Sequence, residues 1–412
     1  MAQIKYYGQT MLSLLLLVII YISFISLGLP DALLGSAWPL MYQLLNVPLH
    51  YAGFISMIVA GGTVVSSVFS AKVTRRFGTG LVTAVSVLMT AAALTGFSLS
   101  HSFWRLCIFA VPLGLGAGSV DAALNNYVAL HYKARHMSWL HCFWGIGASL
   151  GPIIMAAFLM RGQPWNSGFR VIGIIQFCLV LLLFVSLPLW GKKRAAQGAA
   201  RHTSMKFSEL FRITGVKEAL IAFFCYCSIE IIAGFWGASY LVMERGISPE
   251  TAAQWISLYY IGITAGRFVS GFVTMKLNNR QMIRLGQIII GCGVAALILP
   301  LGNSALLGNS ALLPGFFMIG LGCAPIYPSM LHETPQNFGE EYSPSIMGIQ
   351  MGSAYIGMTL MPPIFGRLAS TTGFFIFPLF IAIILIIKII MVEILNRKID
   401  HNKRGSAQPT QP

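Results

Sequence analysis

The chain has 412 residues, of which 56% are hydrophobic and only 9% charged, and its formal net charge is +15. Soluble domains carry about 25% charged residues, so this composition excludes a soluble protein and predicts a membrane protein. The positive charges gather in short loops between apolar runs, a pattern of membrane topology that speaks against nucleic acid as the partner. The seven cysteines form no CxxC pair, so neither a disulfide framework nor a metal site is indicated.

Twelve apolar runs are each long enough to cross ~30 Å of hydrocarbon, which takes about 20 helical residues. The first run continues without a small-residue cleavage site, so we interpret it as a retained transmembrane helix and not as a signal peptide. We therefore expect an all-α integral membrane protein. The runs lie at about 11–36, 49–72, 79–99, 103–128, 137–160, 168–190, 218–243, 251–275, 283–302, 309–331, 344–366 and 370–395.

The Lys and Arg residues predict the orientation of these helices. With a cytoplasmic N-terminus, the inside segments hold twenty of the 27 Lys and Arg residues and the outside loops hold five. Because cytoplasmic loops are enriched in positive charge, we expect both termini in the cytoplasm. The expected location is the cell membrane, which is the inner membrane if the source is bacterial.

The longest polar interruption, residues 191–217, divides the twelve runs into six and six. Its basic and Ala/Gly-rich sequence is typical of a cytoplasmic linker, with a short amphipathic helix around 207–211. The expected organisation is a six-helix bundle over 1–190, the linker over 191–217, a second six-helix bundle over 218–396 and a cytoplasmic tail over 397–412.

The two halves share a weak internal repeat. Gly114 to Gly116 in the fourth run and Gly320 to Gly322 in the tenth are both Gly-Leu-Gly, and 206 residues separate them. The small-residue segments 145–152 and 351–358 lie at the same separation, and related halves are common in transporters. The repeat partner of Asp121 is Tyr327, so we expect the first half to carry a proton and the second half mainly to bind solute.

The whole chain resembles the major facilitator superfamily. The likeness rests on the twelve runs, the basic middle loop and the segment AKVTRRFG at 71–78, although this loop lacks the acidic residue that usually precedes the arginines. The resemblance implies a transporter of two six-helix bundles that works as a monomer.

Within that superfamily, three segments are similar to the fucose–galactose–gluconate:proton symporter family and its glucose-transporter-like relatives. GLPDALL at 28–34 resembles the family's asparagine-aspartate motif, with Asp31 at the aspartate. DAALNN at 121–126 resembles a glutamate-x-alanine-alanine-asparagine-proline motif, with Asp121 in place of the glutamate and Asn126 in place of the proline. WLHCFWGIGA at 139–148 is similar to the segment that follows in these relatives. The resemblance implies proton-coupled sugar transport.

Three of the twelve acidic residues, Asp31, Asp121 and Glu230, lie well inside expected spans. A charge near the bilayer centre costs roughly 3 kcal/mol on insertion scales, so such residues indicate a functional site. Asn125 lies four residues after Asp121 and therefore on the same helix face. We expect Asp121 to couple the proton, with Asp31 sharing that role. The alternatives are that Asp31 caps a helix segment after Pro30 and that Asp121 only bonds a neighbouring helix.

Polar and aromatic side chains inside the spans supply partners for a solute. A sugar ring stacks its C–H face on an aromatic ring, and its hydroxyls need amide, carboxylate or imidazole partners. His141 and Trp144 are three residues apart and share a helix face. For Trp38 and Tyr259 we prefer a packing role. The expected solute-binding residues are Asp31, Asn125, Asn126, His141, Trp144, Glu230, Trp236, Tyr327 and Gln350.

Arg267 lies inside the eighth run, between Gly266 and Gly271. It is either a solute or gate charge or a salt-bridge partner of Glu230, and the sequence leaves both readings open. Prolines 325, 328, 362 and 363 interrupt the tenth and eleventh runs, and such interruptions bend helices around a central site or serve packing.

No GxSxG, HExxH or GxxxxGK[ST] motif is present, so we expect neither an enzyme nor an ATP-driven pump. The predicted function is proton symport of a small polar solute, a sugar or sugar derivative, without cofactor or metal. Three alternatives remain: a proton-coupled exporter of drugs or metabolites, a sodium-coupled sugar transporter, and a transporter-like receptor or lipid scramblase.

Overall fold

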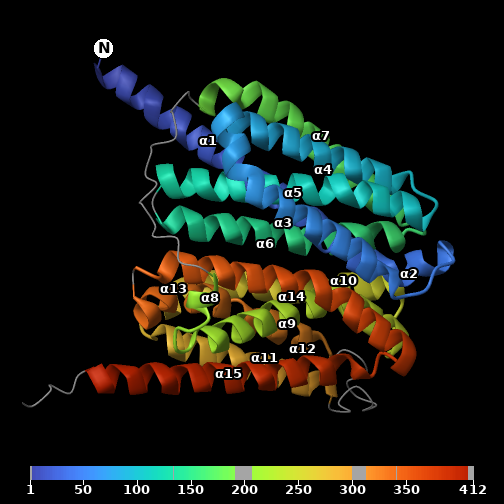
Figure 1. The fold of residues 1–412 in the computed structure, drawn as a ribbon. Helices are drawn as coiled ribbons and strands as arrows, with labels where there is room; N and C mark the ends of the chain where they lie inside the picture. Colours follow the sequence, from blue (N-terminus) through green and yellow to red (C-terminus); the bar gives the residue numbers. More distant parts are fainter. Residues whose placement is uncertain (1, 133, 191–206, 299–311, 340, 407–412) are drawn as a thin grey trace, which may run out of the picture.

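The computed structural model describes residues 2–132, 134–190, 207–298, 312–339 and 341–406. Within these ranges the chain is built from helices, and no β-strand occurs. The N-terminal end of α1 and the C-terminal end of α15 lie at the same end of the bundle, on the left in Figure 1. We call this the termini end and the other the far end.

The first half consists of helices that cross between these two ends. Its helices are α1 (Ala2–Asp31), α2 (Leu33–Leu44), α3 (Tyr51–Phe77), α4 (Thr79–Ser98), α5 (Phe103–His131), α6 (Ala134–Leu159) and α7 (Asn166–Ser186), followed by the 3-10 turn η1 (Leu187–Trp190).

The second half repeats this arrangement after residues 191–206, which lie outside the described residues. The expected short helix near 207–211 is α8. The helices are α8 (Phe207–Leu210), α9 (Val216–Met243), α10 (Pro249–Val273), α11 (Asn279–Ile298), α12 (Leu312–Cys323), α13 (Ile326–Phe338), α14 (Ser343–Thr372) and α15 (Ile376–Ser406). Helix α15 continues past residue 396, where the second bundle was expected to end.

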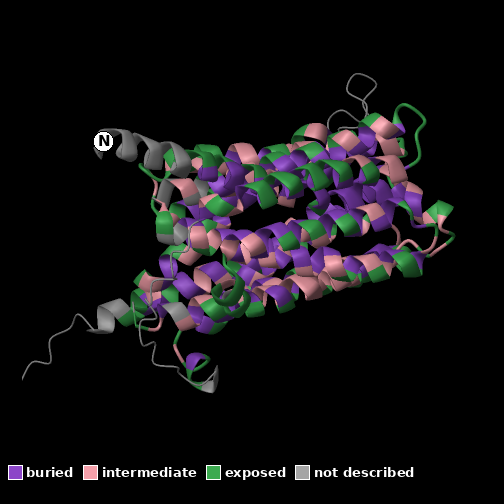
Figure 2. Ribbon diagram, turned by 90° about the horizontal axis from the view of Figure 1, so that it is seen from above, coloured by how far each residue is buried: buried purple, intermediate pink, exposed green. Residues whose placement is uncertain are grey.

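Eleven stretches of the described chain are long and apolar enough to cross a membrane. Helix α14, at 30 residues, occupies the place of the expected eleventh span but is less apolar. Large apolar side chains such as Val185, Phe272 and Trp104 are exposed on the helices, and Figure 2 shows buried residues between the layers. An apolar exterior of this extent is the surface that a lipid bilayer covers.

Two of the expected spans are broken helices. The first turns at Ala32, between α1 and α2, directly after the sequence Pro30-Asp31. The tenth breaks at Ala324 and Pro325, between α12 and α13. Proline lacks a backbone donor and its ring clashes with the preceding turn, so a break near each proline follows from the local sequence. Freed backbone groups in a membrane are tolerated where protein surrounds them.

Equivalent close contacts in the two halves agree with the repeat seen in the sequence. A Cβ at Gly114 of α5 would meet the Val59 carbonyl of α3, and a Cβ at Gly320 of α12 would meet the Tyr259 carbonyl of α10. Each glycine therefore lets two helix backbones approach closely, as small residues do in membrane bundles. The pairs stand at matching positions of the second and fourth spans and of the eighth and tenth.

The two halves meet closely toward the far end. A Cβ at Gly35 of α2 would lie 2.5 Å from the Phe235 carbonyl oxygen of α9, and a Cβ at Gly53 of α3 would collide with Pro363 of α14. Close backbone contacts therefore join the two halves on the far-end side of the central residues.

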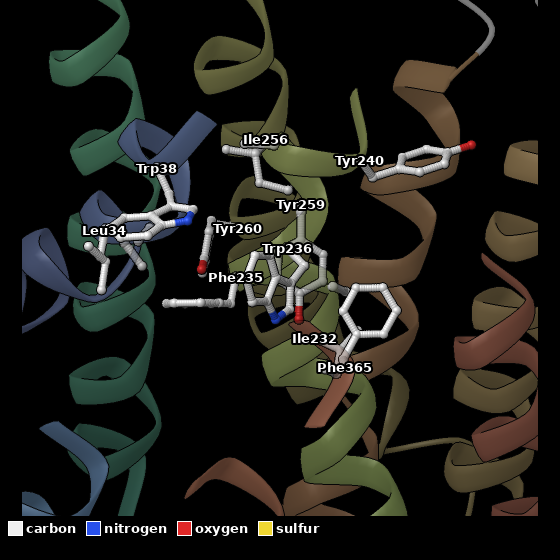
Figure 3. Packing of buried hydrophobic residues seen from close by; sticks show 14 of the residues in the cluster. Leu34, Trp38, Ile232, Phe235, Trp236, Tyr240, Ile256, Tyr259, Tyr260 and Phe365 are labelled. Carbon is white, nitrogen blue, oxygen red and sulfur yellow. The ribbon is translucent and has the colours of Figure 1, made fainter. Parts of the chain in front are cut away.

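An aromatic layer fills this contact. Figure 3 shows Phe235 and Tyr260 of the second half extending toward Leu34 and Trp38 of the first. Trp38 is fully buried, and its indole Nε1 donates a hydrogen bond to the Leu49 carbonyl. We call the cluster of Leu34, Trp38, Phe235 and Tyr260 the far-end layer. It lies on the far-end side of the central residues, since Leu34 and Trp38 follow Asp31 along the chain toward that end and Phe235 follows Glu230.

Ion pairs hold the C-terminal part of α15 to its neighbours at the termini end. Arg284 donates to both oxygens of Glu393 at 2.8 and 2.7 Å, and Lys398 donates to Glu218 at 2.7 Å. This end of α15 is therefore attached to α11 and α9 as far as Lys398.

Candidate functional site

Four side chains form a line of contacts across the boundary between the halves. The indole Nε1 of Trp144 donates a 2.7 Å hydrogen bond to Asp31 Oδ2. The Arg267 guanidinium lies over the Trp144 ring, 4.9 Å from its centroid, and its Nη2 is 3.6 Å from Glu230 Oε1. Asp31 and Trp144 belong to the first half, and Arg267 and Glu230 to the second. We call these four residues the central cluster.

Glycines bring the three relevant helices together. A Cβ at Gly28 of α1 would collide with the Trp144 carbonyl of α6, so these backbones touch beside Asp31. A Cβ at Gly145 of α6 would collide with Thr264 of α10, which is one turn before Arg267. The close approach of α6 to both neighbours places Trp144 between the carboxylate and the guanidinium.

The side chains of the central cluster remain partly exposed although they lie midway along apolar spans. Asp31 is exposed, and the side chains of Arg267 and Glu230 are 20% and 24% exposed. The contact between Arg267 and Trp144 joins the two halves, so the cluster lies at the boundary between them. Ionisable residues that face the interior of a membrane bundle mark solute or ion pathways.

Asp121 lies on α5 and is partly exposed. The Asn125 side-chain amide donates to Asp121 Oδ1 at 2.9 Å and to the Asp121 backbone oxygen at 3.0 Å, so the two residues share a face as their spacing predicted. Asn126 is exposed beside Asn125.

His141 takes part in this region through its backbone. Its carbonyl accepts a hydrogen bond from Arg267 Nη1 at 3.4 Å, and its ring packs edge-on against Phe24 at 6.0 Å. The sequence suggested the imidazole as a hydroxyl partner. The structure turns that ring toward α1 and presents the main-chain oxygen to Arg267.

Three predicted solute-binding residues lie apart from the central cluster. Trp236 is fully buried, and its indole donates to the Pro362 carbonyl at 3.0 Å behind the far-end layer. Tyr327 packs against Phe223 at 5.2 Å and is partly buried. Gln350 is 2% exposed and accepts a hydrogen bond from Thr334.

Sequence reasoning missed one contact between the halves. Tyr355 of α14 lies near Ser67 of α3, and the Ser67 hydroxyl donates a hydrogen bond to the Gly118 carbonyl at 3.2 Å. The only available signal was a pair of serines in a small-residue helix, which is too common to single out one position.

His50 lies between the first two spans, at the far-end boundary of the halves. Its Cα is 3.4 Å from the Cβ position of Gly366, and burial together with the Arg367 cation lowers the pKa of His50 below its ordinary value of 6.5. Protonation of His50 would therefore place two cations against each other across the two halves.

The described residues contain no group of three or more His, Cys, Asp and Glu side chains that could hold a metal ion. The central cluster contains acceptors for hydroxyl groups, one planar cation and one indole. These groups can bind a polar solute and exchange protons.

Two bundles of apolar helices with ionisable side chains at their boundary are the architecture of a membrane transporter. The chain belongs to the Major Facilitator Superfamily, whose family model matches residues 20–331 and 219–411. It is therefore a membrane transporter and not an enzyme, as the sequence predicted.

Two curated relatives and one solved structure illustrate the similarity. The chain is 23% identical to the glucose/mannose transporter GlcP of Bacillus subtilis, over 76% of this chain and 77% of the relative. It is 24% identical to the cis,cis-muconate transport protein of Acinetobacter baylyi, over 79% of this chain and 80% of the relative. The crystal structure of the nucleoside transporter NupG matches with a TM-score of 0.75 at 12% identity, covering 92% of this chain and 98% of that one.

Proposed function

We propose that the chain is a secondary active transporter that carries a sugar or sugar derivative by proton symport with alternating access. The observation that supports this proposal is the central cluster, because it joins polar groups of both halves midway along the spans. A solute bound there contacts both halves and is therefore sensitive to their relative movement. The similarity to a glucose/mannose transporter favours a sugar.

In this proposal Asp121 is the proton-coupling residue, and Asp31 shares the proton while binding solute hydroxyls. Asp121 has one side-chain amide partner, Asn125, and belongs to the same half as Asp31, so in this proposal the two negative charges repel each other. A shared proton relieves that repulsion, and its release restores it. In this proposal the protein works as a monomer with both termini in the cytoplasm, so the termini end faces the cytoplasm.

The test is solute accumulation in proteoliposomes under an imposed pH gradient. Wild type should accumulate solute against its gradient, and Asp121→Asn should only equilibrate it. Glu244→Gln, which changes an exposed carboxylate at the far end, is the matched control and should behave as wild type. If Asp121→Asn accumulated solute as wild type does, the coupling assignment would be wrong.

The same assay separates the alternatives. Replacement of sodium by choline abolishes accumulation in a sodium-coupled transporter and leaves a proton symporter unaffected. An exporter drives solute out of the compartment as protons enter. A receptor binds solute, seen as quenching of tryptophan fluorescence, without any flux.

A further inference from the structure

The Arg267 guanidinium makes unusually loose polar contacts for a charged group inside a membrane bundle. Its nearest carboxylate oxygen, on Glu230, is 3.6 Å away, and its bond to the His141 carbonyl is 3.4 Å long. Arg284 forms a tighter ion pair, because it donates to both oxygens of Glu393 at 2.8 and 2.7 Å. Arg267 thus leaves much of its capacity of five N–H donors unused.

The guanidinium is nevertheless held in place. It lies over the Trp144 ring, 4.9 Å from the centroid, and this cation–π contact restrains the guanidinium. Trp144 is in turn fixed by its 2.7 Å hydrogen bond to Asp31. A restrained planar fork of donors with unused N–H groups matches the two oxygens of a carboxylate.

Arg267 is also the cation that a solute can reach. Of the two basic residues that lie deep within spans, Lys388 is fully buried in α15, whereas Arg267 is 20% exposed at the boundary between the halves. Asp31 lies on the other side of Trp144, and its second oxygen can accept hydrogen bonds from solute hydroxyls. The cluster therefore offers a cationic end and a hydroxyl-binding end.

We propose that the transported solute carries a carboxylate, which binds Arg267 in place of Glu230 while its hydroxyls bind near Asp31. The solute class is a sugar acid or a related hydroxycarboxylate, and this inference rests on the proposed function. A carboxylate is favoured over a phosphate because the two acidic side chains of the cluster repel a double negative charge more strongly than a single one.

The experiment measures binding to the full-length protein in detergent by ligand-dependent thermal shift, since a ligand that binds only the folded state raises Tm. Two matched pairs serve as probes. D-gluconate and D-sorbitol differ by a carboxylate against a CH2OH group, and D-glucuronate differs from D-glucose in the same way. Each acid should bind at least about tenfold more tightly than its neutral partner.

Three variants connect this preference to Arg267. Arg267→Gln should reduce acid binding to the level of the neutral partner, while Arg267→Lys should retain part of the preference. Glu230→Gln should strengthen acid binding, because it removes the competing carboxylate. The control Arg284→Gln removes a cation at the termini end and should leave the preference unchanged.

The outcomes separate the inference from the proposed function. If neutral sugars bind as tightly as the acids, or if Glu230→Gln weakens acid binding, the carboxylate assignment is overturned and sugar transport stands. If no member of either pair binds or is taken up, sugar transport fails, and the sugar acid assignment fails with it. Arg267-dependent binding of cis,cis-muconate alone would support carboxylate recognition and refute the sugar class.

Discussion

The substitution Gly35→Val should destabilise the conformation in which the two halves meet at the far end. A Cβ at this position would lie 2.5 Å from the Phe235 carbonyl oxygen, whereas ordinary contact begins at 3.4 Å, so the two backbones must separate by about 0.9 Å. Overpacking of this kind costs about 1–3 kcal/mol. If the cost falls only on the closed arrangement, its population relative to the open one drops roughly 5- to 150-fold.

Double electron–electron resonance between spin labels at Gln163 and Thr372 measures this change. Both residues are exposed at the far end, one in each half. The labels are attached to cysteines in a protein whose exposed Cys178 and Cys292 are replaced by serine. Gly35→Val should shift the distance distribution toward longer separations and slow transport.

Gly61→Val is the matched control, because a Cβ at Gly61 has no atom within 4 Å. The change in helix propensity from glycine to valine is the same at both positions. It should leave the distances as in wild type. If Gly35→Val gave the same distribution as Gly61→Val, the α2–α9 contact would not determine closure, and the reasoning from backbone proximity would be refuted.

Two further predictions concern the central cluster and the far-end boundary. Trp144→Phe keeps an aromatic face for the guanidinium but loses the indole donor to Asp31, so solute affinity measured by thermal shift should fall roughly tenfold or more; an unchanged affinity would contradict the anchoring role. The second prediction concerns His50, whose pKa in the folded state is lowered by burial and by the Arg367 cation. Below pH 6.5 the unfolded state therefore binds a proton at His50 that the folded state does not bind. Stability is fully present above that pH and declines below it, so the Tm of wild type should fall more steeply between pH 7 and pH 5 than that of His50→Gln, and parallel curves would refute this linkage.

The helical architecture could be predicted because the length of an apolar run can be counted directly in the sequence. Runs of about 20 apolar residues have few alternatives to membrane-spanning helices, and proline marked both broken spans. The Gly114 and Gly320 pair was visible because the repeat placed identical residues at matching positions.

The directions of side chains were harder to predict. Trp236 and Gln350 were expected at the solute site, yet one lies behind the far-end layer and the other in the core of the second half. Helices such as α9 are apolar on all sides, so no amphipathic pattern tells which face looks toward the partner bundle.

The proximity of Arg267 to Glu230 is likewise a property of packing. The two residues lie on different helices, and either an ion pair or two separate charges would have fitted the same sequence. The structure decides for a pair, though a loose one of 3.6 Å.

The line from Asp31 through Trp144 to Arg267 also determines how the protein can be blocked. Each half contributes one end of this row of contacts. A molecule bound to Arg267 is therefore transported only if it is small enough for α2 and α9 to meet on its far-end side. A ligand with the same carboxylate and hydroxyl groups and a rigid extension toward the far-end layer would bind and hold the halves apart. Inhibitors of this transporter are therefore expected to be elongated versions of its solute.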